Sequence, residues 1–277
     1  MIANSINTNP GAMIALQNLN ATNGDLATTQ NRISTGLKVN SAKDDASTWA
    51  IAQNQRATSL SLTAVKDSLS RGTSAIDVAL SAGQSVSDLL LQMKAKSLAS
   101  SDQGLDANSR SALNEDFKAL RDQITVIIGN ADFNGANLLK AGAVDLFALA
   151  NADGTTRLTA TAEDMSLGAA IVTIQSTDSI STATTASAMI ATTQTSIDNV
   201  SAALARLGTQ SKSFERHLVF VSKLQDTIEA GIGNLVDADL AKESAKLQAL
   251  QTKQQLGIQA LSIANQTPTI VLSLFRG

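Results

Sequence analysis

The chain has 277 residues, one histidine, no cysteine and a formal net charge of −3 at pH 7. This weakly acidic balance, with no basic stripe, argues against a nucleic-acid-binding protein. The missing cysteines exclude disulfides and thiolate metal sites, and a single histidine excludes a zinc site built from several histidines, so we expect no metal and no cofactor.

The first helical pattern begins near the N-terminus. Pro10 suits the first turn of a helix, where its missing N–H removes no hydrogen bond. The following positions recur at alternating steps of four and three residues, a repeat typical of helices that pack along their length against other helices. These positions, which we call the seam of the helix, are Ala12, Leu16, Leu19, Asn23, Leu26, Gln30, Ile33 and Leu37. We therefore predict a helix that ends at about residue 37.

The last segment of the chain has the same rhythm. Gly231 and Gly233 interrupt the preceding helix, and Asp237 suits the N-cap of a new one. The predicted seam of this final helix consists of Leu240, Glu243, Leu247, Leu250, Gln254, Gly257, Leu261, Ala264, Val271 and Phe275.

Both terminal helices lack the charged outer face that a helix exposed on a soluble monomer normally carries. Asp25 is the only charged side chain before Arg32, and none lies between Lys253 and Arg276. Asn, Gln, Ser and Thr occupy these faces instead. We therefore expect the outer faces to be buried against other copies of the chain.

Three further helices are predicted between the two ends. Their inward stripes, again with steps of three and four, cover residues 62–93, 113–127 and 190–235. A turn at residues 101–108 separates the first two. The stretch Gly36–Asp45 carries no stripe and is rich in Asn and Asp, which predicts an ordered joint held by local turn hydrogen bonds.

A small β element is predicted between these helices. Phe133-Asn-Gly135 has turn chemistry, and residues 144–150 form a short apolar run. Asn151-Ala-Asp-Gly154 predicts a hairpin turn before the alternating stretch 157–162, and the polar stretch 173–186 is predicted as a loop or a short strand. The predicted fold class is mainly α: a long antiparallel helical rod or coiled coil with a small β-hairpin, whose termini pair in an inner coiled-coil domain.

The candidate catalytic groups have simpler structural explanations. His217 lies beside Leu218 on a predicted helix, and nothing in the sequence marks a triad around it. The pairs Asp44/Asp45 and Asp237/Asp239 lie at helix breaks, where turns and caps use aspartate. Gly231-Ile-Gly233 lacks the further glycine and the strand of a phosphate loop. We do not expect an enzyme.

A secreted helical effector or translocator that acts on membranes is the alternative function. Amphipathic ends would fit it, but interfacial helices usually carry Lys or Arg on their polar face. The longest uncharged run, residues 254–275, is broken by polar residues and Pro268, which makes it a poor membrane span. Residues 1–11 lack the features of a cleaved secretory signal. We expect no membrane insertion, and any export would need a dedicated apparatus.

Motifs at both ends of the chain resemble bacterial flagellin, of the short alphaproteobacterial kind. At the N-terminal end they are Ile6-Asn-Thr-Asn9, Ala15-Leu-Gln-Asn-Leu19 and Arg32-Ile-Ser-Thr-Gly-Leu-Lys-Val-Asn-Ser-Ala-Lys-Asp-Asp45. At the C-terminal end they are Val236-Asp-Ala-Asp-Leu240, Gln254-Gln-Leu-Gly-Ile-Gln-Ala-Leu261, Ala264-Asn-Gln266 and Leu272-Ser-Leu-Phe-Arg276. Motifs with this spacing at both ends are specific to the family.

The resemblance implies a structural subunit that polymerises into the extracellular flagellar filament used for swimming. It implies an inner coiled-coil domain of residues 1–37 and 236–277 that lines the filament channel, with a spoke joint at 38–45. It also implies a helical rod domain at 46–235, whose hairpin region covers about residues 130–185. The large outer domains of long flagellins have no counterpart here.

The resemblance also implies partners and an export route. The partners would be other copies of the chain, related flagellins, a flagellar export chaperone, and the hook-junction and filament-cap proteins, with no nucleic acid. Export would proceed through the flagellar secretion apparatus without a cleaved signal.

The candidate functional residues form two groups, neither of them catalytic, metal-binding or cofactor-binding. The candidates for the polymer interface are Leu16, Leu19, Leu26, Ile33, Leu247, Leu250, Leu261 and Phe275. The candidates for the spoke joint are Arg32, Gly36, Asn40, Lys43, Asp44 and Asp45. Because the joint would lie between packed layers, we expect Asp44 and Asp45 to matter more to filament form than to folding of the monomer.

Overall fold

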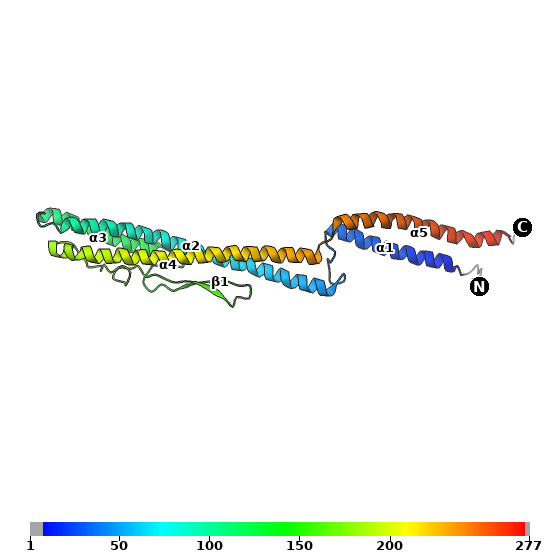
Figure 1. The fold of residues 1–277 in the computed structure, drawn as a ribbon, viewed down its shortest axis with the longest axis horizontal. Coiled ribbons are helices and arrows are strands. Elements are labelled where there is room, and N and C mark those ends of the chain that lie inside the picture. Colours follow the sequence, from blue (N-terminus) through cyan, green and yellow to red (C-terminus); the bar gives the residue numbers. More distant parts are fainter. Residues whose placement is uncertain (1–7, 275–277) are drawn as a thin grey trace. The chain divides into compact units, whose positions relative to one another are not determined.

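The computed structural model describes residues 8–274, with side chains described up to residue 266. The elements follow the order α1 (Pro10–Thr35), α2 (Ala46–Ser100), α3 (Ala107–Asn130), β1 (Leu146–Leu149), β2 (Arg157–Ala160), α4 (Ala183–Val236) and α5 (Leu240–Leu274) (Figure 1). The predicted fold class, long helices with one small antiparallel hairpin, is confirmed.

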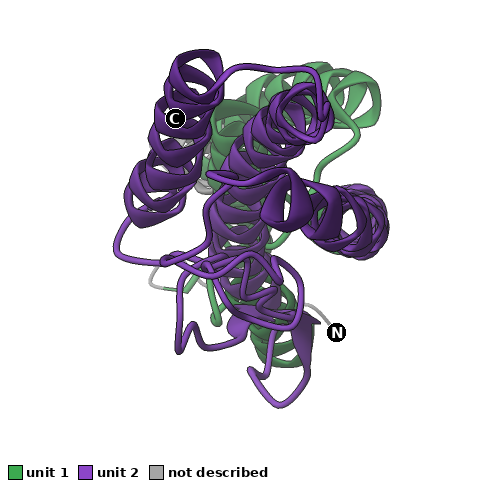
Figure 2. Ribbon diagram, turned by 90° about the vertical axis from the view of Figure 1, so that its left-hand side faces the viewer, with its two compact units in different colours: residues 1–57, 227–277 green, residues 58–226 purple. Residues whose placement is uncertain are grey.

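The chain divides into two compact units. Unit 1 comprises residues 1–57 and 227–277, and unit 2 comprises residues 58–226 (Figure 2). Unit 1 joins the two ends of the sequence, while unit 2 contains α3, the hairpin and most of α2 and α4.

The core of unit 2 lies between α2, α3 and α4. Helix α4 runs antiparallel to α2, since Lys66 on α2 bonds to Gln225 on α4 and Lys94 bonds to Gln194. Every position of the stripe predicted for residues 62–93 is buried, and every position of the stripe at 190–235 is buried or half-buried. The largest fully buried side chains of these helices include Phe117, Phe214, Leu62, Leu69, Ile76, Leu90, Met93 and Ile124.

One glycine allows a close approach of α2 to α4. A Cβ atom at Gly72 would lie 2.5 Å from Cε1 of Phe214, a separation that real Cβ atoms essentially never show. Phe214 is only 1% exposed, so its ring has little room to move aside. A larger residue at position 72 would therefore separate the two helices or displace the ring.

The buried face of α3 is shifted slightly around the helix from the predicted stripe. Phe117 and Ile124 are fully buried as predicted, but Leu113, Leu120 and Ile127 are only half-buried. Asn114 and Ile128 are buried as well. Asn114 has a structural role there, because its Oδ1 accepts a hydrogen bond of 2.8 Å from the backbone N–H of Ile180.

The hairpin forms where turn residues and the apolar run predicted it. β1 pairs antiparallel with β2, with Leu146 opposite Ala160 and Leu149 opposite Arg157. The preceding turn contains Asn134 and Gly135, both with positive φ, as the Phe133-Asn-Gly135 motif predicted. Residues 161–182 contain no strand and form an irregular loop, one of the two forms predicted for residues 173–186. Residues 183–186 of that stretch were predicted wrongly, because they form the first turn of α4.

His217 and Arg206 make two of the contacts that attach the hairpin and the loop to α4. Nε2 of His217 lies 2.7 Å from the carbonyl oxygen of Ala150, just after β1, and the imidazole packs against Phe220. The buried carboxylate of Glu163 accepts two hydrogen bonds of 2.6 Å from the guanidinium of Arg206. The lone histidine therefore has a structural partner in the fold.

Candidate assembly site in the terminal helices and their joint

Helices α1 and α5 lie side by side and run antiparallel within unit 1 (Figure 1). Three contacts define their alignment. The Asn9 side-chain amide donates a 2.7 Å hydrogen bond to the Ala264 carbonyl, Gln254 donates a 2.7 Å bond to Asn23, and Arg32 contacts Glu243 at 3.2 Å. Residues near the start of α1 thus lie beside residues near the end of α5, as the predicted pairing of the termini requires.

The ends of α1 are formed by local signals. Asn9 is the N-cap, and its side chain accepts a hydrogen bond from the backbone N–H of Ala12, directly before Pro10 at the first helical position. Gly36 ends the helix with a φ of 73°, and its N–H donates to the Arg32 carbonyl. The helix therefore ends at Thr35, two residues before the predicted end, because Gly36 takes the left-handed conformation.

The predicted seam of α5 faces α1. Glu243 and Leu250 are buried, and the half-buried seam positions are Leu247, Gln254, Gly257, Leu261 and Ala264. Leu240, the first residue of the helix, is exposed. The side chain of Val271 and the whole of Phe275 lie outside the described residues.

The seam of α1 differs from the prediction at every second position. Leu19, Leu26 and Ile33 are half-buried, but Leu16, Asn23 and Gln30 are exposed. Thr22 and Thr29 are buried instead, each one residue earlier than predicted. The contact stripe follows the positions closest to α5, whether or not they are apolar. Thr22 and Thr29 lie two helical turns apart and therefore on the same face of α1. Their burial was not predicted, because the seam was identified from apolar residues and threonine is not one of them.

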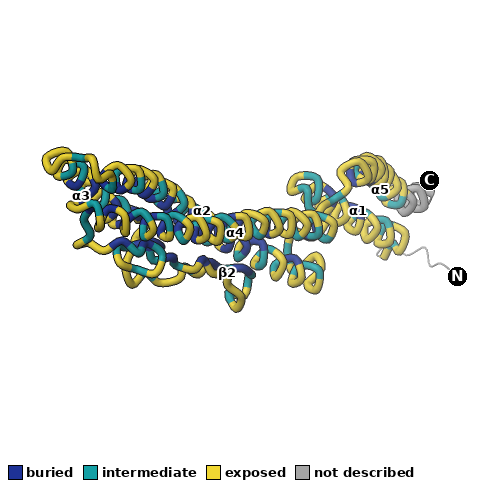
Figure 3. Tube along the Cα trace, turned by 60° about the vertical axis from the view of Figure 1, so that its left-hand side comes forward, coloured by how far each residue is buried: buried dark blue, intermediate teal, exposed yellow. Residues whose placement is uncertain are grey.

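Large apolar side chains are exposed on the outer faces of both helices. Along α1 and α5, yellow exposed residues border a narrow half-buried stripe (Figure 3). Between 48% and 67% of each of these side chains is accessible. The residues are Met13, Ile14, Leu16, Leu240, Ile258 and Ile263, together with Leu256, which also lines the groove between the two helices. The outer faces therefore carry apolar surface in addition to the uncharged polar residues seen in the sequence.

A shallow groove runs between the two helices on one side. Its volume is about 240 Å³. It is lined by Ala15, Asn18, Leu19, Thr22, Lys253, Leu256, Gly257 and Ala260. Gly257 allows the close contact there, because a Cβ atom at this position would lie 3.3 Å from Cδ1 of Leu19.

The two helix breaks that flank the terminal helices pair with each other. The N–H of Lys38 donates a 2.7 Å hydrogen bond to the Val236 carbonyl, and the N–H of Ala238 donates a 2.8 Å bond to the Gly36 carbonyl. Leu37 and Asp237 form the antiparallel bridge between these bonds. The sequence showed both breaks but not their pairing, which joins residues about two hundred positions apart.

The joint has its own small apolar core. Val39, Ala52, Ile232 and Val236 are buried together. Leu37, Trp49, Ile228 and Leu235 pack against them and remain partly exposed. Since Trp49 is the only tryptophan and the chain has no tyrosine, its fluorescence reports on this core alone.

Two aspartates hold the backbone of the joint, as its turn chemistry predicted. Oδ2 of Asp44 accepts hydrogen bonds from the N–H groups of Asn40 and Ser41, at 3.1 and 2.9 Å. Asp45 accepts from the N–H groups of Ser47 and Thr48, both at 3.1 Å, at the start of α2. The Ser41 amide lowers the pKa of Asp44, and the Thr48 amide is the main cause that lowers the pKa of Asp45 to about 2.

The remaining joint candidates are placed differently. Gly36 caps α1, and Asn40 contributes its backbone N–H to Asp44. Lys43 is exposed, and its backbone N–H donates to the Ser41 hydroxyl. Arg32 contacts Glu243 on α5 and so belongs to the helix pair. The role of this group in a filament stays a prediction.

The joint should loosen in acid in a way that depends on Asp45. A depressed pKa means that the aspartate stabilises the folded joint above its unfolded pKa of about 3.8, and that this contribution is lost as pH falls toward 2. We expect the amide signals of Ser47 and Thr48 to shift between pH 4 and 2 in a nuclear magnetic resonance titration. In Asp45→Asn, which keeps an oxygen acceptor but does not titrate, they should stay constant.

The matched variant Asp44→Asn should show the complementary behaviour. The amides of Asn40 and Ser41 should then stop responding to acid, while those of Ser47 and Thr48 respond as in the unmodified chain. An acid response of Ser47 and Thr48 that is the same in Asp45→Asn and in the unmodified chain would contradict the assignment.

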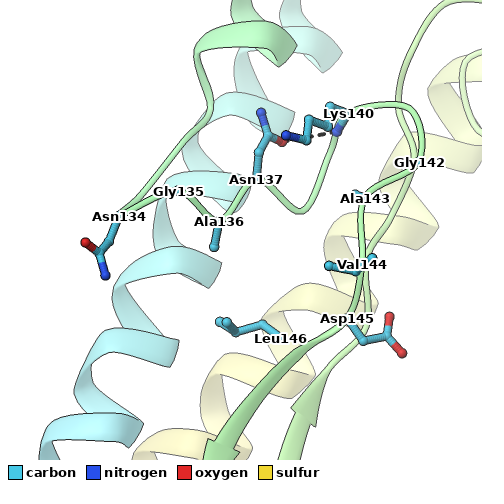
Figure 4. Close-up of a pocket in the computed structure, with 10 residues that line it drawn as sticks. All are labelled: Asn134, Gly135, Ala136, Asn137, Lys140, Gly142, Ala143, Val144, Asp145 and Leu146. Carbon is cyan, nitrogen blue, oxygen red and sulfur yellow. Dashed lines mark hydrogen bonds between the residues drawn. The ribbon is translucent and has the colours of Figure 1, made fainter.

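Unit 2 contains a further cavity, beside the hairpin. It has a volume of about 410 Å³ and is lined by residues 134–137, 140 and 142–146 (Figure 4). Asn137 accepts hydrogen bonds from the N–H groups of Leu139 and Lys140, and Asp145 accepts one from Ala162. These two polar side chains thus hold the surrounding turns. Among the described residues, no three His, Asp or Glu side chains gather closely enough to hold a metal ion.

Two models of known protein families match this chain, one toward each end of the sequence. Residues 6–143 match the bacterial flagellin N-terminal helical region, which takes in α1, the joint, α2 and α3. Residues 190–275 match the bacterial flagellin C-terminal helical region, which takes in most of α4 and α5. None of the helices, within the residues described, is long and apolar enough to cross a membrane.

Whole-length relatives agree with these matches. Flagellin FljM of Caulobacter vibrioides is 56% identical and flagellin FljK of the same organism is 55% identical, each over 100% of both chains. A flagellin of Brucella melitensis is 36% identical over 99% of each chain. The crystal structure of Bacillus cereus flagellin aligns with a TM-score of 0.49 and 24% identity, over 55% of this chain and 87% of that one. The chain therefore belongs to the flagellin family, the structural subunits that polymerise with themselves and with related flagellins into the extracellular filament with which bacteria swim.

Proposed function

We propose that α1 and α5 form the assembly domain of this subunit and order fully only when they join other copies in the filament. The observation that carries the proposal is the large apolar surface that both helices leave exposed. Exposed apolar patches of this kind mark surfaces that associate. Residues 1–37 and 236–277 then form the inner coiled-coil domain that lines the channel, with residues 38–45 as the spoke.

The contact between α1 and α5 buries little apolar surface. The buried side chains on α1 are Thr22 and Thr29. On α5, Glu243 and Leu250 are the buried ones among residues 240–266. A helix pair needs apolar burial to offset the entropy lost when its backbone becomes ordered. Burial among neighbouring copies supplies what the single pair lacks.

The charge distribution supports burial of the outer faces. The stretch from residue 254 to residue 275 contains no charged side chain, and Asp25 is the only one before Arg32. Removing a charge from water without a partner costs much free energy, whereas uncharged polar and apolar side chains can be buried in a helical assembly. These faces therefore suit contact with other copies better than permanent contact with water.

The candidate interface residues then act in two ways. Leu16, with its exposed neighbours Met13 and Ile14, contacts other copies directly. The seam residues Leu19, Leu26, Ile33, Leu247, Leu250 and Leu261 align α1 with α5 and so present these outer faces. Phe275 belongs to the same proposal, although it lies outside the described residues.

For the remaining parts of the chain, we propose the roles that the corresponding parts have in the flagellin family. Residues 46–235 act as the helical rod, with the hairpin region at about 130–185 on the filament surface. The subunit passes unfolded through the flagellar secretion apparatus without a cleaved signal, escorted by an export chaperone, and meets the hook-junction and cap proteins at the filament. A chain without cysteine needs no disulfide to refold after such export. The subunit has no enzymatic role.

Removal of α5 tests the proposal. A chain that ends at Val236 keeps unit 2 and the buried residues of the joint core. We expect it to remain a helical monomer by circular dichroism and sedimentation, and to form no filaments under salt conditions that polymerise the full chain. Filaments grown from this truncated chain would contradict the proposal.

Hydrogen exchange of the full chain provides a second readout. In the free subunit, amides of α1 and α5 should exchange far faster than those of the buried parts of α2 and α4. In the filament, all four helices should be protected. Equal protection of α5 and α4 in the free subunit would show that the terminal helices fold without partners.

A further inference from the structure

Three polar atoms are buried in the contact between α1 and α5 without a hydrogen-bond partner in the chain. They are Oγ1 of Thr29, Nε of Arg32 and Oε2 of Glu243. Thr29 is fully buried and Glu243 is 9% exposed, while the Arg32 side chain is one-third exposed. Buried polar groups in native proteins are nearly always paired, so three unpaired atoms in one place need an explanation.

The ion pair in this cluster is incompletely formed. A single contact of 3.2 Å joins Nη1 of Arg32 to Oε1 of Glu243. By contrast, Arg206 donates two bonds of 2.6 Å to Glu163 in unit 2, which is the geometry that the forked guanidinium favours. The contact thus leaves the buried Nε of Arg32 and the buried Oε2 of Glu243 unused.

The ends of the two helices favour this orientation of the charges. Arg32 lies in the last turn of α1 and Glu243 in the first turn of α5. A cation is stabilised at a helix C-terminus and an anion at an N-terminus. The pair therefore favours the antiparallel arrangement, in which the end of α1 lies next to the start of α5.

The pair also distinguishes one alignment of the helices from others. Among the described residues, it is the one ion pair between α1 and α5. The other described seam positions on α5 are uncharged. Sliding α5 by one heptad toward its N-terminus would bring Leu250 to the level of Arg32 and separate Arg32 from Glu243. A polar residue in a helical seam specifies register in this way and lowers stability.

We propose that Thr29, Arg32 and Glu243 form a register lock, which selects one alignment of α1 with α5 and weakens their pairing within a single chain. This inference rests on the function proposed above, in which the terminal helices order on assembly. The lock serves both needs: the pair stays weak in the free subunit, yet it can form in one register only.

Replacing the cluster with apolar side chains of similar size tests the lock. Removing a buried, incompletely satisfied ion pair in this way is often stabilising. In the full-length variant Thr29→Val/Arg32→Met/Glu243→Leu, trypsin cleavage of the free subunit after Lys246 and Lys253 should slow by about tenfold. Filaments of this variant should be mixed in form by electron microscopy, whereas the unmodified chain should give uniform ones.

Two further variants separate the lock from a general effect of apolar substitution. Glu243→Leu alone leaves Arg32 without its partner, so trypsin cleavage should become no slower than in the unmodified chain. Gln254→Leu replaces the polar residue that donates to Asn23 on the same seam. It should leave the filaments uniform, since Asn23 is exposed and can bond to water.

The outcomes distinguish the lock from the proposed function. If the triple variant is cleaved as fast as the unmodified chain and forms uniform filaments, the lock is wrong. If α5 of the unmodified free subunit already resists trypsin as well as α4 does, ordering on assembly is wrong. The lock then stands or falls on filament uniformity alone.

Discussion

Replacing Leu250 with Asp should abolish filament formation. Leu250 is 7% exposed and lies on the α5 seam that faces α1. An aspartate there would bury an unpaired carboxylate, and the resulting loss of several kcal/mol exceeds what so small an apolar contact can supply. Salt-induced polymerisation, followed by electron microscopy and sedimentation, should show only subunits, and cells that carry this chain as their sole flagellin should not swim.

A control at Lys246 separates burial from charge. Lys246 lies one turn earlier on α5, is exposed and is already charged. Lys246→Asp introduces the same carboxylate without burying it, so this variant should still polymerise. Unit 2 should remain folded in both variants, with unchanged circular dichroism of its helices. Normal swimming with Leu250→Asp would show that the α1–α5 seam is not needed for assembly.

Replacing Phe214 with Ala should lower the free energy of unfolding of unit 2 by about 3–5 kcal/mol, the usual range for an aromatic side chain removed from a core. Phe214 is 1% exposed and fills the space that Gly72 leaves on α2. The cavity left behind would lie between two long helices whose backbones cannot easily collapse. Guanidinium unfolding followed by circular dichroism measures the change.

Phe220 on the same helix is the matched control. It is 57% exposed and packs against His217 at the surface. Phe220→Ala removes the same atoms with little change in burial, so we expect a loss below about 1 kcal/mol. Equal losses in the two variants would contradict the assignment of Phe214 to the core. Trp49 fluorescence should be unchanged in both, because Trp49 belongs to the core of the joint.

Features that depend on neighbouring residues could be predicted from the sequence. Pro10 begins α1 and Asp45 accepts hydrogen bonds at the start of α2, each through contacts within a few residues. The hairpin formed around its turn signals, and the stripe at 62–93 is buried throughout. A capping bond, a turn and the helical period act over one or two turns of chain, so the residue types are sufficient to predict them.

The seam of α1 shows where apolar pattern alone failed. Leu16 fits the heptad and is apolar, yet it is exposed, while Thr29 is fully buried. Which side of α1 faces inward is decided by α5, which begins about two hundred residues later in the chain. The stripe that contains Leu16 and the stripe that contains Thr29 are close together on the helix. The sequence of α1 does not tell which of them packs against α5, because contact with a neighbouring helix overrides the preference of single residues.

The residue types alone predicted the helices, the start of α1, the hairpin and, through the motifs at both ends of the chain, the flagellin family. The predicted N-cap of α5, Asp237, was wrong, because Asp239 accepts the hydrogen bonds from the N–H groups of Ala241 and Lys242 there. The tertiary structure decided that the breaks at Gly36 and Asp237 pair with each other, and that Arg32 meets Glu243 across the terminal helices. It also decided which apolar side chains of these helices remain exposed. The reason is physical: local structure follows from steps of three and four residues, whereas register and exposure depend on contacts between segments that only folding brings together.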